Sequence, residues 1–188
     1  MKKILMTLAA VLCCAMTTTM LTACGDDDDN NNSPKDEPAK AEMECEVYTS
    51  SETLEALDFY FTYYDESGNV KTEKITWSDN VNDEGYLTWK KKVSAKLPAT
   101  LGALCEMKAK DGIDLDGQYT ITHGYKIGFK SLAASGKTIS EYNPEAFTIT
   151  SRNKQGKLVD FLNEGGKFLN ILYKYDSNGK GAGSGTWE

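Results

Sequence analysis

The sequence predicts an all-β fold, an antiparallel β-sandwich or alternatively a small barrel, and three observations favour it. From Tyr119 to Lys130, tyrosine, isoleucine, phenylalanine and the single histidine occupy alternate positions. Because successive side chains of a strand point to opposite faces, this pattern describes a strand with one buried and one solvated surface. Clusters of Asp, Asn and Gly separate several such segments, and a helical pattern is found only at residues 154–163.

Each expected strand combines β-branched or aromatic residues with this alternation. In chain order, we expect strands at Met43–Thr49, Leu57–Tyr64, Val70–Trp77, Tyr86–Val93, Leu104–Lys110, Tyr119–Lys130, Phe147–Thr150 and Phe168–Tyr175. The clusters Asp65–Asn69 and Asp176–Gly179 suit type I turns closed by a glycine at positive φ. After the last strand, glycine occupies alternate positions from Gly179 to Gly185, which predicts a loop because glycine weakens a strand.

The N-terminus has the pattern of an export signal. Lys2 and Lys3 precede the apolar run Ile4–Ala15, which is too short for a permanent transmembrane helix. The signal ends in Leu21-Thr22-Ala23-Cys24, which resembles the lipobox of bacterial lipoproteins. This resemblance implies that residues 1–23 are removed and that Cys24 carries acyl chains, which would anchor the protein to a membrane. The alternative is an ordinary secreted protein with a chance cysteine near its cleavage site.

Residues 24–40 are expected to be a solvated tether, because the segment 25–38 contains no large apolar side chain. The acidic tract Asp26–Asp29 also resembles the export tag that carries some Gram-negative lipoproteins to the outside of the outer membrane. It therefore implies an outer-membrane lipoprotein at the cell surface. The alternative is that the aspartates only keep the tether extended, which would leave the periplasmic face open as a location. Residues 41–188 are expected to form one β domain.

Composition argues against several function classes. The net charge is −7, and nucleic acids are bound first through neutralised phosphates, so a nucleic-acid partner is not expected. Arg152 is the only arginine and His123 the only histidine, and His123 lies on the apolar face of its strand. No nucleophile elbow, phosphate-binding glycine loop or paired His-Glu helix motif occurs. We therefore expect no catalytic residues, no metal and no cofactor, and interpret Asp111–Gly117 as a turn rather than a calcium loop.

Two cysteines remain after export, because Cys13 and Cys14 leave with the signal and Cys24 takes the lipid. Cys45 and Cys105 each lie on the apolar side of an expected strand. An envelope compartment is oxidising, which makes this pair a candidate disulfide. The alternative is a pair of buried thiols that are too far apart to meet.

Aromatic side chains are the most distinctive candidates for binding. The alternation cannot place all of them toward one core, and flat amphipathic rings on a sheet are used by sugar-binding and protein-binding surfaces. A second sheet packed on that face would bury them equally well. The candidate ligand-binding residues are Tyr60, Tyr64, Trp77, Trp89 and Trp187.

These observations together predict a membrane-anchored, surface-exposed lipoprotein whose β domain is a binding or adhesion module for a glycan or an envelope protein. One alternative is a structural or assembly subunit of an envelope complex. A second is a glycan hydrolase that uses a carboxylate pair, which the sequence can neither nominate nor exclude.

Overall fold

The computed structural model describes residues 36–115, 117–152 and 157–187. The predicted signal, the lipobox with Cys24 and most of the predicted tether lie outside the described residues. The first strand, β1 (Pro38–Thr49), begins three residues before Ala41, the expected start of the β domain. Its first residues therefore belong to a sheet rather than to the tether.

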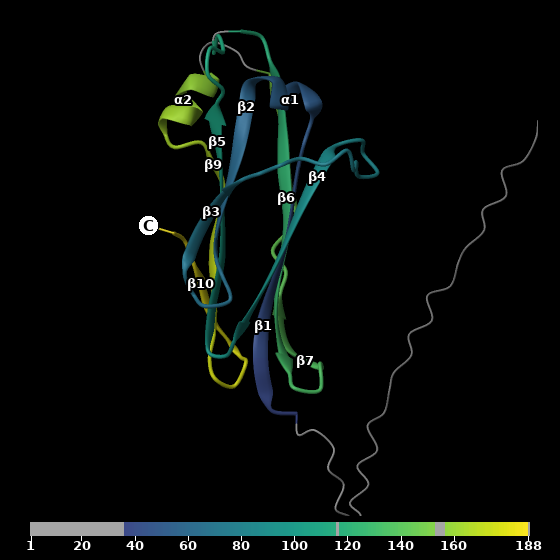
Figure 1. Ribbon diagram of the computed structural model, residues 1–188, viewed down its shortest axis with the longest axis vertical. Helices are drawn as coiled ribbons and strands as arrows, with labels where there is room; N and C mark the ends of the chain where they lie inside the picture. Colours follow the sequence, from purple (N-terminus) through teal and green to yellow (C-terminus); the bar gives the residue numbers. More distant parts are fainter. Residues whose placement is uncertain (1–35, 116, 153–156, 188) are drawn as a thin grey trace, which may run out of the picture. The chain divides into compact units, whose positions relative to one another are not determined.

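Two five-stranded antiparallel sheets form the fold (Figure 1). Sheet A contains, in spatial order, β4 (Leu87–Lys96), β1, β6 (Thr120–Ala133) and β7 (Thr138–Tyr142), and β8 (Phe147–Arg152) also pairs with β6. Sheet B contains β10 (Gly181–Gly185), β9 (Lys167–Tyr175), β5 (Ala99–Ala109), β2 (Leu57–Tyr64) and β3 (Val70–Lys74). The predicted β-sandwich is confirmed, and the alternative small barrel is not formed because the two sheets stay open.

The core lies between the two sheets and follows the predicted alternation. On β1, Met43, Cys45 and Val47 are buried, and on β2 the inward residues Phe59 and Phe61 are fully buried. Burying a side chain of this size contributes about 1.5–3 kcal/mol relative to leaving it in water. The intervening residues of each strand form the outer faces of the two sheets.

A short helix that the sequence pattern did not predict, α1 (Ser51–Ala56), connects β1 to β2. The side chain of Ser50 caps it by accepting a hydrogen bond from the backbone N–H of Thr53. Thr53 is buried and its hydroxyl donates to the carbonyl of Thr122 on β6. Tertiary contacts rather than an amphipathic period therefore stabilise α1.

The second helix, α2 (Lys157–Asn163), confirms the described part of the helix expected at 154–163. It ends where Gly165 and Gly166 adopt positive φ, and their N–H groups donate to the carbonyls of Leu162 and Phe161. A side chain at position 166 would collide with the carbonyl of Met107 on β5. The glycine pair therefore both ends the helix and allows the chain to approach β5.

Several strands differ from the prediction. Residues 181–185, expected as a loop, form β10 because β9 offers a backbone ladder that does not depend on side chains. β7 was not predicted because its alternation is short and its residues are mostly exposed. Trp77 lies beyond the end of β3, which is shorter than expected.

Candidate functional site

Two of the five candidate aromatics pack against the core. The ring of Trp77 meets Phe59 edge-on with 5.2 Å between centroids, and the ring of Trp89 lies 4.9 Å from that of Phe61. Both tryptophans are half-buried. Trp89 of sheet A therefore has the alternative arrangement, in which the opposite sheet covers the ring, whereas Trp77 packs on Phe59 of the sheet that its own segment extends.

The other three aromatics lie on the outer face of sheet B. Tyr60 and Tyr64 project from β2 on the side opposite Phe59 and Phe61, as the alternation predicts. The ring of Trp187 stacks on Tyr64, with 4.6 Å between centroids and 17° between planes. The structure therefore brings Tyr64 and Trp187 together, although they are far apart in the sequence. We call this pair the Tyr64–Trp187 platform.

Two residues that the sequence analysis did not identify hold Trp187 in place. Asn170 of β9 accepts the backbone N–H of Trp187 through Oδ1 at 2.7 Å, and its amide nitrogen donates to the Trp187 carbonyl at 3.4 Å. Gly102 of β5 lies beneath the ring, and a Cβ at that position would lie 3.0 Å from Trp187 Cζ2. Neither residue stands in a recognisable motif, so only the three-dimensional structure identifies them.

Tyr60 lies on the same face of β2 as Tyr64 and has a cationic neighbour. The ammonium of Lys108 on β5 is 4.7 Å from the centre of the Tyr60 ring. A cation over a ring face is attracted by the ring quadrupole, by about 0.5–1 kcal/mol at an exposed site. Tyr60 therefore extends the aromatic outer face of sheet B toward a positive charge.

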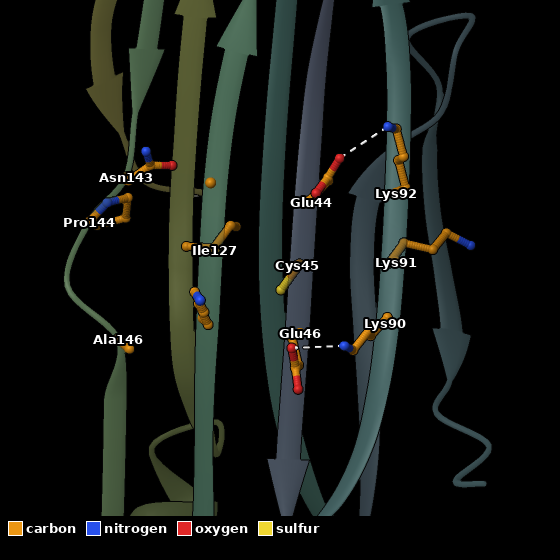
Figure 2. Close-up of a pocket in the computed structure, with 12 residues that line it drawn as sticks. Glu44, Cys45, Glu46, Lys90, Lys91, Lys92, Ile127, Asn143, Pro144 and Ala146 are labelled. Carbon is orange, nitrogen blue, oxygen red and sulfur yellow. Dashed lines mark hydrogen bonds and ion pairs between the residues drawn. The ribbon is translucent and has the colours of Figure 1, made fainter. Parts of the chain in front are cut away.

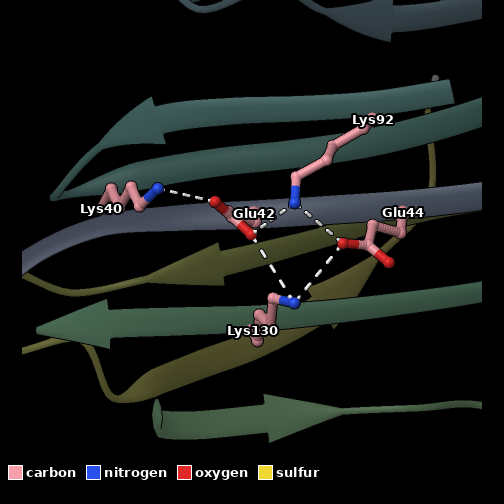
Figure 3. Close-up of polar contacts among 5 residues, drawn as sticks. All are labelled: Lys40, Glu42, Glu44, Lys92 and Lys130. Carbon is pink, nitrogen blue, oxygen red and sulfur yellow. Dashed lines mark hydrogen bonds and ion pairs between the residues drawn. The ribbon is translucent and has the colours of Figure 1, made fainter. Parts of the chain in front are cut away.

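The outer face of sheet A carries a cluster of charged side chains (Figure 3). Glu42 on the central strand β1 contacts Lys40 at 2.7 Å, Lys92 of β4 at 3.1 Å and Lys130 of β6 at 3.6 Å. Burial alone would raise the pKa of Glu42, but hydrogen bonds from Lys40 and Lys92 and their charges outweigh it and lower the pKa to about 2. Glu44 shares Lys92 and Lys130, and its pKa is also lowered. Both carboxylates are therefore ionised at neutral pH.

A groove of about 620 Å³ crosses this face beside the cluster (Figure 2). Its walls come from β4, β1 and β6 and from the connection between β7 and β8, residues 143–146. Glu44 and Glu46 of β1 pair with Lys92 at 3.0 Å and Lys90 at 3.2 Å. Gly128 of β6 contributes no side chain, which leaves room in the groove.

Cys45 and Cys105 are buried as free thiols on β1 and β5, strands that belong to opposite sheets. Burial raises the pKa of both thiols, and each lies within the core. The pair is unbridged in the structure. Neutral, buried thiols are poor nucleophiles, because the thiolate is the reactive form.

His123 is a buried core residue, as the apolar face of its strand predicts. Its ring lies 4.8 Å from that of Phe168 and 6.4 Å from that of Phe161. Burial lowers the pKa of His123 to about 4, so the ring is neutral at neutral pH. Nδ1 has no hydrogen-bond partner among the described residues.

Over residues 36–115, 117–152 and 157–187, no group of three or more His, Cys, Asp or Glu side chains converges as a metal site. Within Asp111–Gly117, the N–H of Gly117 donates to the carbonyl of Asp114, as in a turn. Among the residues that the structure describes, no helix has both the length and the apolar character needed to span a bilayer.

Comparison of the chain with protein-family models, curated proteins and solved structures found no match. Functional inference therefore depends on the residues of the two outer faces.

Proposed function

We propose that this protein is a surface-exposed outer-membrane lipoprotein and that its β-sandwich is a binding module. Cys24 would hold the chain on the membrane, and the acidic tether would keep the folded part away from an anionic surface. The observation that carries the binding role is the Tyr64–Trp187 platform. Two rings stacked on each other, both half-buried, stand on an outer sheet face at the boundary with water, and such amphipathic rings are suited to contact a ligand.

The ligand class that best suits this platform is carbohydrate. The apolar faces of sugar rings stack on aromatic side chains, and such stacking requires no strong charge. Asn170 and Gly102 fix the position of Trp187 before any ligand arrives, and a preorganised surface loses less entropy on binding. A protein partner that places a ring or an aliphatic side chain on the platform is the other form of the same proposal.

A glycan array with the chain lacking residues 1–24 tests the proposal, followed by single alanine variants. Trp187→Ala and Tyr64→Ala should each weaken binding to any array ligand by about tenfold or more, as expected for a buried aromatic contact. Trp77→Ala is the matched control, because it removes a tryptophan that packs on the inner side. An array without a bound glycan, or a hit that survives loss of Trp187, would reject the carbohydrate form of the proposal.

An assembly role is favoured by one observation, the free edge of β10. This edge strand has the sequence Gly-Ala-Gly-Ser-Gly and is exposed, whereas the edge strand β4 of the other sheet carries Lys90, Lys92 and Lys96. Uncharged edges are available for pairing with another chain. Sedimentation analysis of the chain and of Ala182→Lys tests this role, because strand pairing predicts an oligomer that the added charge weakens. A monomer at all concentrations rejects self-assembly.

A further inference from the structure

The hydrogen-bond ladder of sheet A is interrupted at one edge of β6. β6 pairs with β8 up to Tyr125–Phe147 and with β7 from Phe129–Tyr142. Between these pairs, residues 126–128 of β6 face residues 143–146 of the connection. This connection contains Pro144, which has no N–H to donate to a ladder. Figure 2 shows Asn143, Pro144 and Ala146 on a segment that bows away from β6 beside Ile127.

The interruption leaves the backbone of Ile127 without partners. The N–H of Ser50 donates to the carbonyl of Thr122, so Thr122 and every second residue after it point their backbone groups toward β1. Ile127 lies an odd number of residues from Thr122, so its N–H and C=O point to the other edge of β6, toward the connection 143–146. No described residue bonds to either group. Because Ile127 is only 2% exposed, this is an unpaired backbone donor and acceptor in a buried position, and such groups are rare.

Further polar groups without partners surround this position. Lys126 and Asn143 both line the groove, and within the described residues neither side chain forms an ion pair or a hydrogen bond. The carboxylates of Glu44 and Glu46 are already neutralised by Lys92 and Lys90. The unpaired charge along the groove is therefore the ammonium of Lys126, which makes the groove locally positive on an acidic protein.

We propose that this groove binds an acidic sugar unit, one that carries a carboxylate and several hydroxyls. The carboxylate would accept hydrogen bonds from the exposed ammonium of Lys126, and hydroxyls would pair with the exposed side-chain amide of Asn143, which can both donate and accept. A simple anion would leave the amide oxygen of Asn143 without a donor, and a neutral sugar would leave Lys126 without a carboxylate. Pro144 and Ala146 offer a small apolar wall for the ring of the sugar. This site goes beyond the Tyr64–Trp187 platform, because it lies on the other sheet and selects for charge.

The test is calorimetric titration of the full chain in a zwitterionic, sugar-free detergent with trigalacturonate. Maltotriose is the neutral probe of equal length, and polyglutamate is the non-sugar polyanion. We expect trigalacturonate to bind more tightly than either. Lys126→Met should raise its Kd about tenfold or more, the effect of losing a charge-assisted hydrogen bond. Gly128→Ala should also weaken binding, because a Cβ there would lie 2.5 Å from Asn143 Oδ1 and force that side chain out of its position in the groove lining.

Two control variants make the result specific. Lys180→Met removes an exposed lysine in the turn before β10 and should leave the Kd unchanged. The titrations are also repeated with Trp187→Ala, which removes the platform. Binding that remains in this variant, and that Lys126→Met weakens, belongs to the groove, whereas binding that is lost belongs to the platform, so that failure of the platform and failure of the groove are separate results. The inference is overturned if trigalacturonate does not bind at millimolar concentration, if maltotriose or polyglutamate binds equally well, or if Lys126→Met binds as the parent does.

Discussion

At the scale of single residues, His123 determines how the fold responds to mild acid. Burial among aromatic rings lowers the pKa of His123 to about 4, below its ordinary value of 6.5. Between these two values the unfolded chain binds a proton that the folded chain does not bind. The contribution of His123 to the free energy of unfolding is therefore fully present above about pH 6.5, and it is lost as the pH drops toward 4.

We expect this loss to reach about 3 kcal/mol over the whole window, since one pKa unit corresponds to about 1.4 kcal/mol. His123→Phe should remove most of the dependence, because phenylalanine does not titrate and suits the surrounding rings. Urea unfolding at pH 7, 5.5 and 4.5 measures the effect. Tyr125→Phe, two residues along β6, is the control that keeps the histidine. If the free energy of unfolding changes with pH equally in His123→Phe and in the parent chain, His123 is not the group responsible. Glu42 lowers the free energy of unfolding further only below about pH 4.5, because its pKa is reduced from 4.5 to about 2 in the folded chain.

At the scale of elements, the end of α2 depends on Gly166. Gly166 combines positive φ with close contact to the Met107 carbonyl, whereas Gly68 has positive φ with open space, to at least 4 Å, around the point where a Cβ would stand. Gly68→Ala should therefore cost roughly 1–2 kcal/mol, the cost of a left-handed residue. Gly166→Ala should cost more than that by about 1–3 kcal/mol, because the side chain also overpacks the contact. Chemical denaturation of both variants measures the loss in free energy of unfolding. An equal loss in the two variants would show that the contact with Met107 does not exclude a side chain at position 166.

The sequence predicts the elements that alternation and turn chemistry determine, and it predicts little of what tertiary contacts determine. β2 and β6 follow from alternation, and the positive φ of Gly68 and Gly179 follows from the turns expected there. α1 was missed because its stability comes from Thr53 and β6, and β10 because a partner strand overrides the low strand preference of glycine. In the candidate site, the outward direction of Tyr64 was predictable. Its pairing with Trp187 was not, because Gly102 and Asn170 carry no local signal.

At the scale of the whole molecule, the two sheets meet around Cys45 and Cys105. The structure has free thiols with raised pKa values, so the folded chain from residue 25 should resist alkylation near pH 8. After denaturation without reductant, mass spectrometry should find two alkylated thiols. No alkylation before reduction would instead establish the candidate disulfide. Its loop should then stabilise the fold by about 2–4 kcal/mol.

The proposed membrane anchor depends on Cys24. We expect Cys24→Ser to abolish incorporation of radiolabelled palmitate and to release the protein from the membrane fraction, because the thiol is the acylated group. Protease treatment of intact cells then distinguishes locations, since a surface domain is lost and a periplasmic one is protected. A variant that is still acylated and sediments with membranes would reject the lipobox interpretation.

The central position of β1 has a mechanical consequence. β1 follows the predicted tether in the sequence, and it is paired along its length with β4 on one side and with β6 on the other. A pull through the tether along the direction of β1 therefore loads both ladders in shear, so that many hydrogen bonds must break together rather than one after another. A strand at the edge of a sheet would share the same force with one neighbour. With the proposed anchor and binding role, the fold would be attached at a point suited to resist drag on a bound ligand.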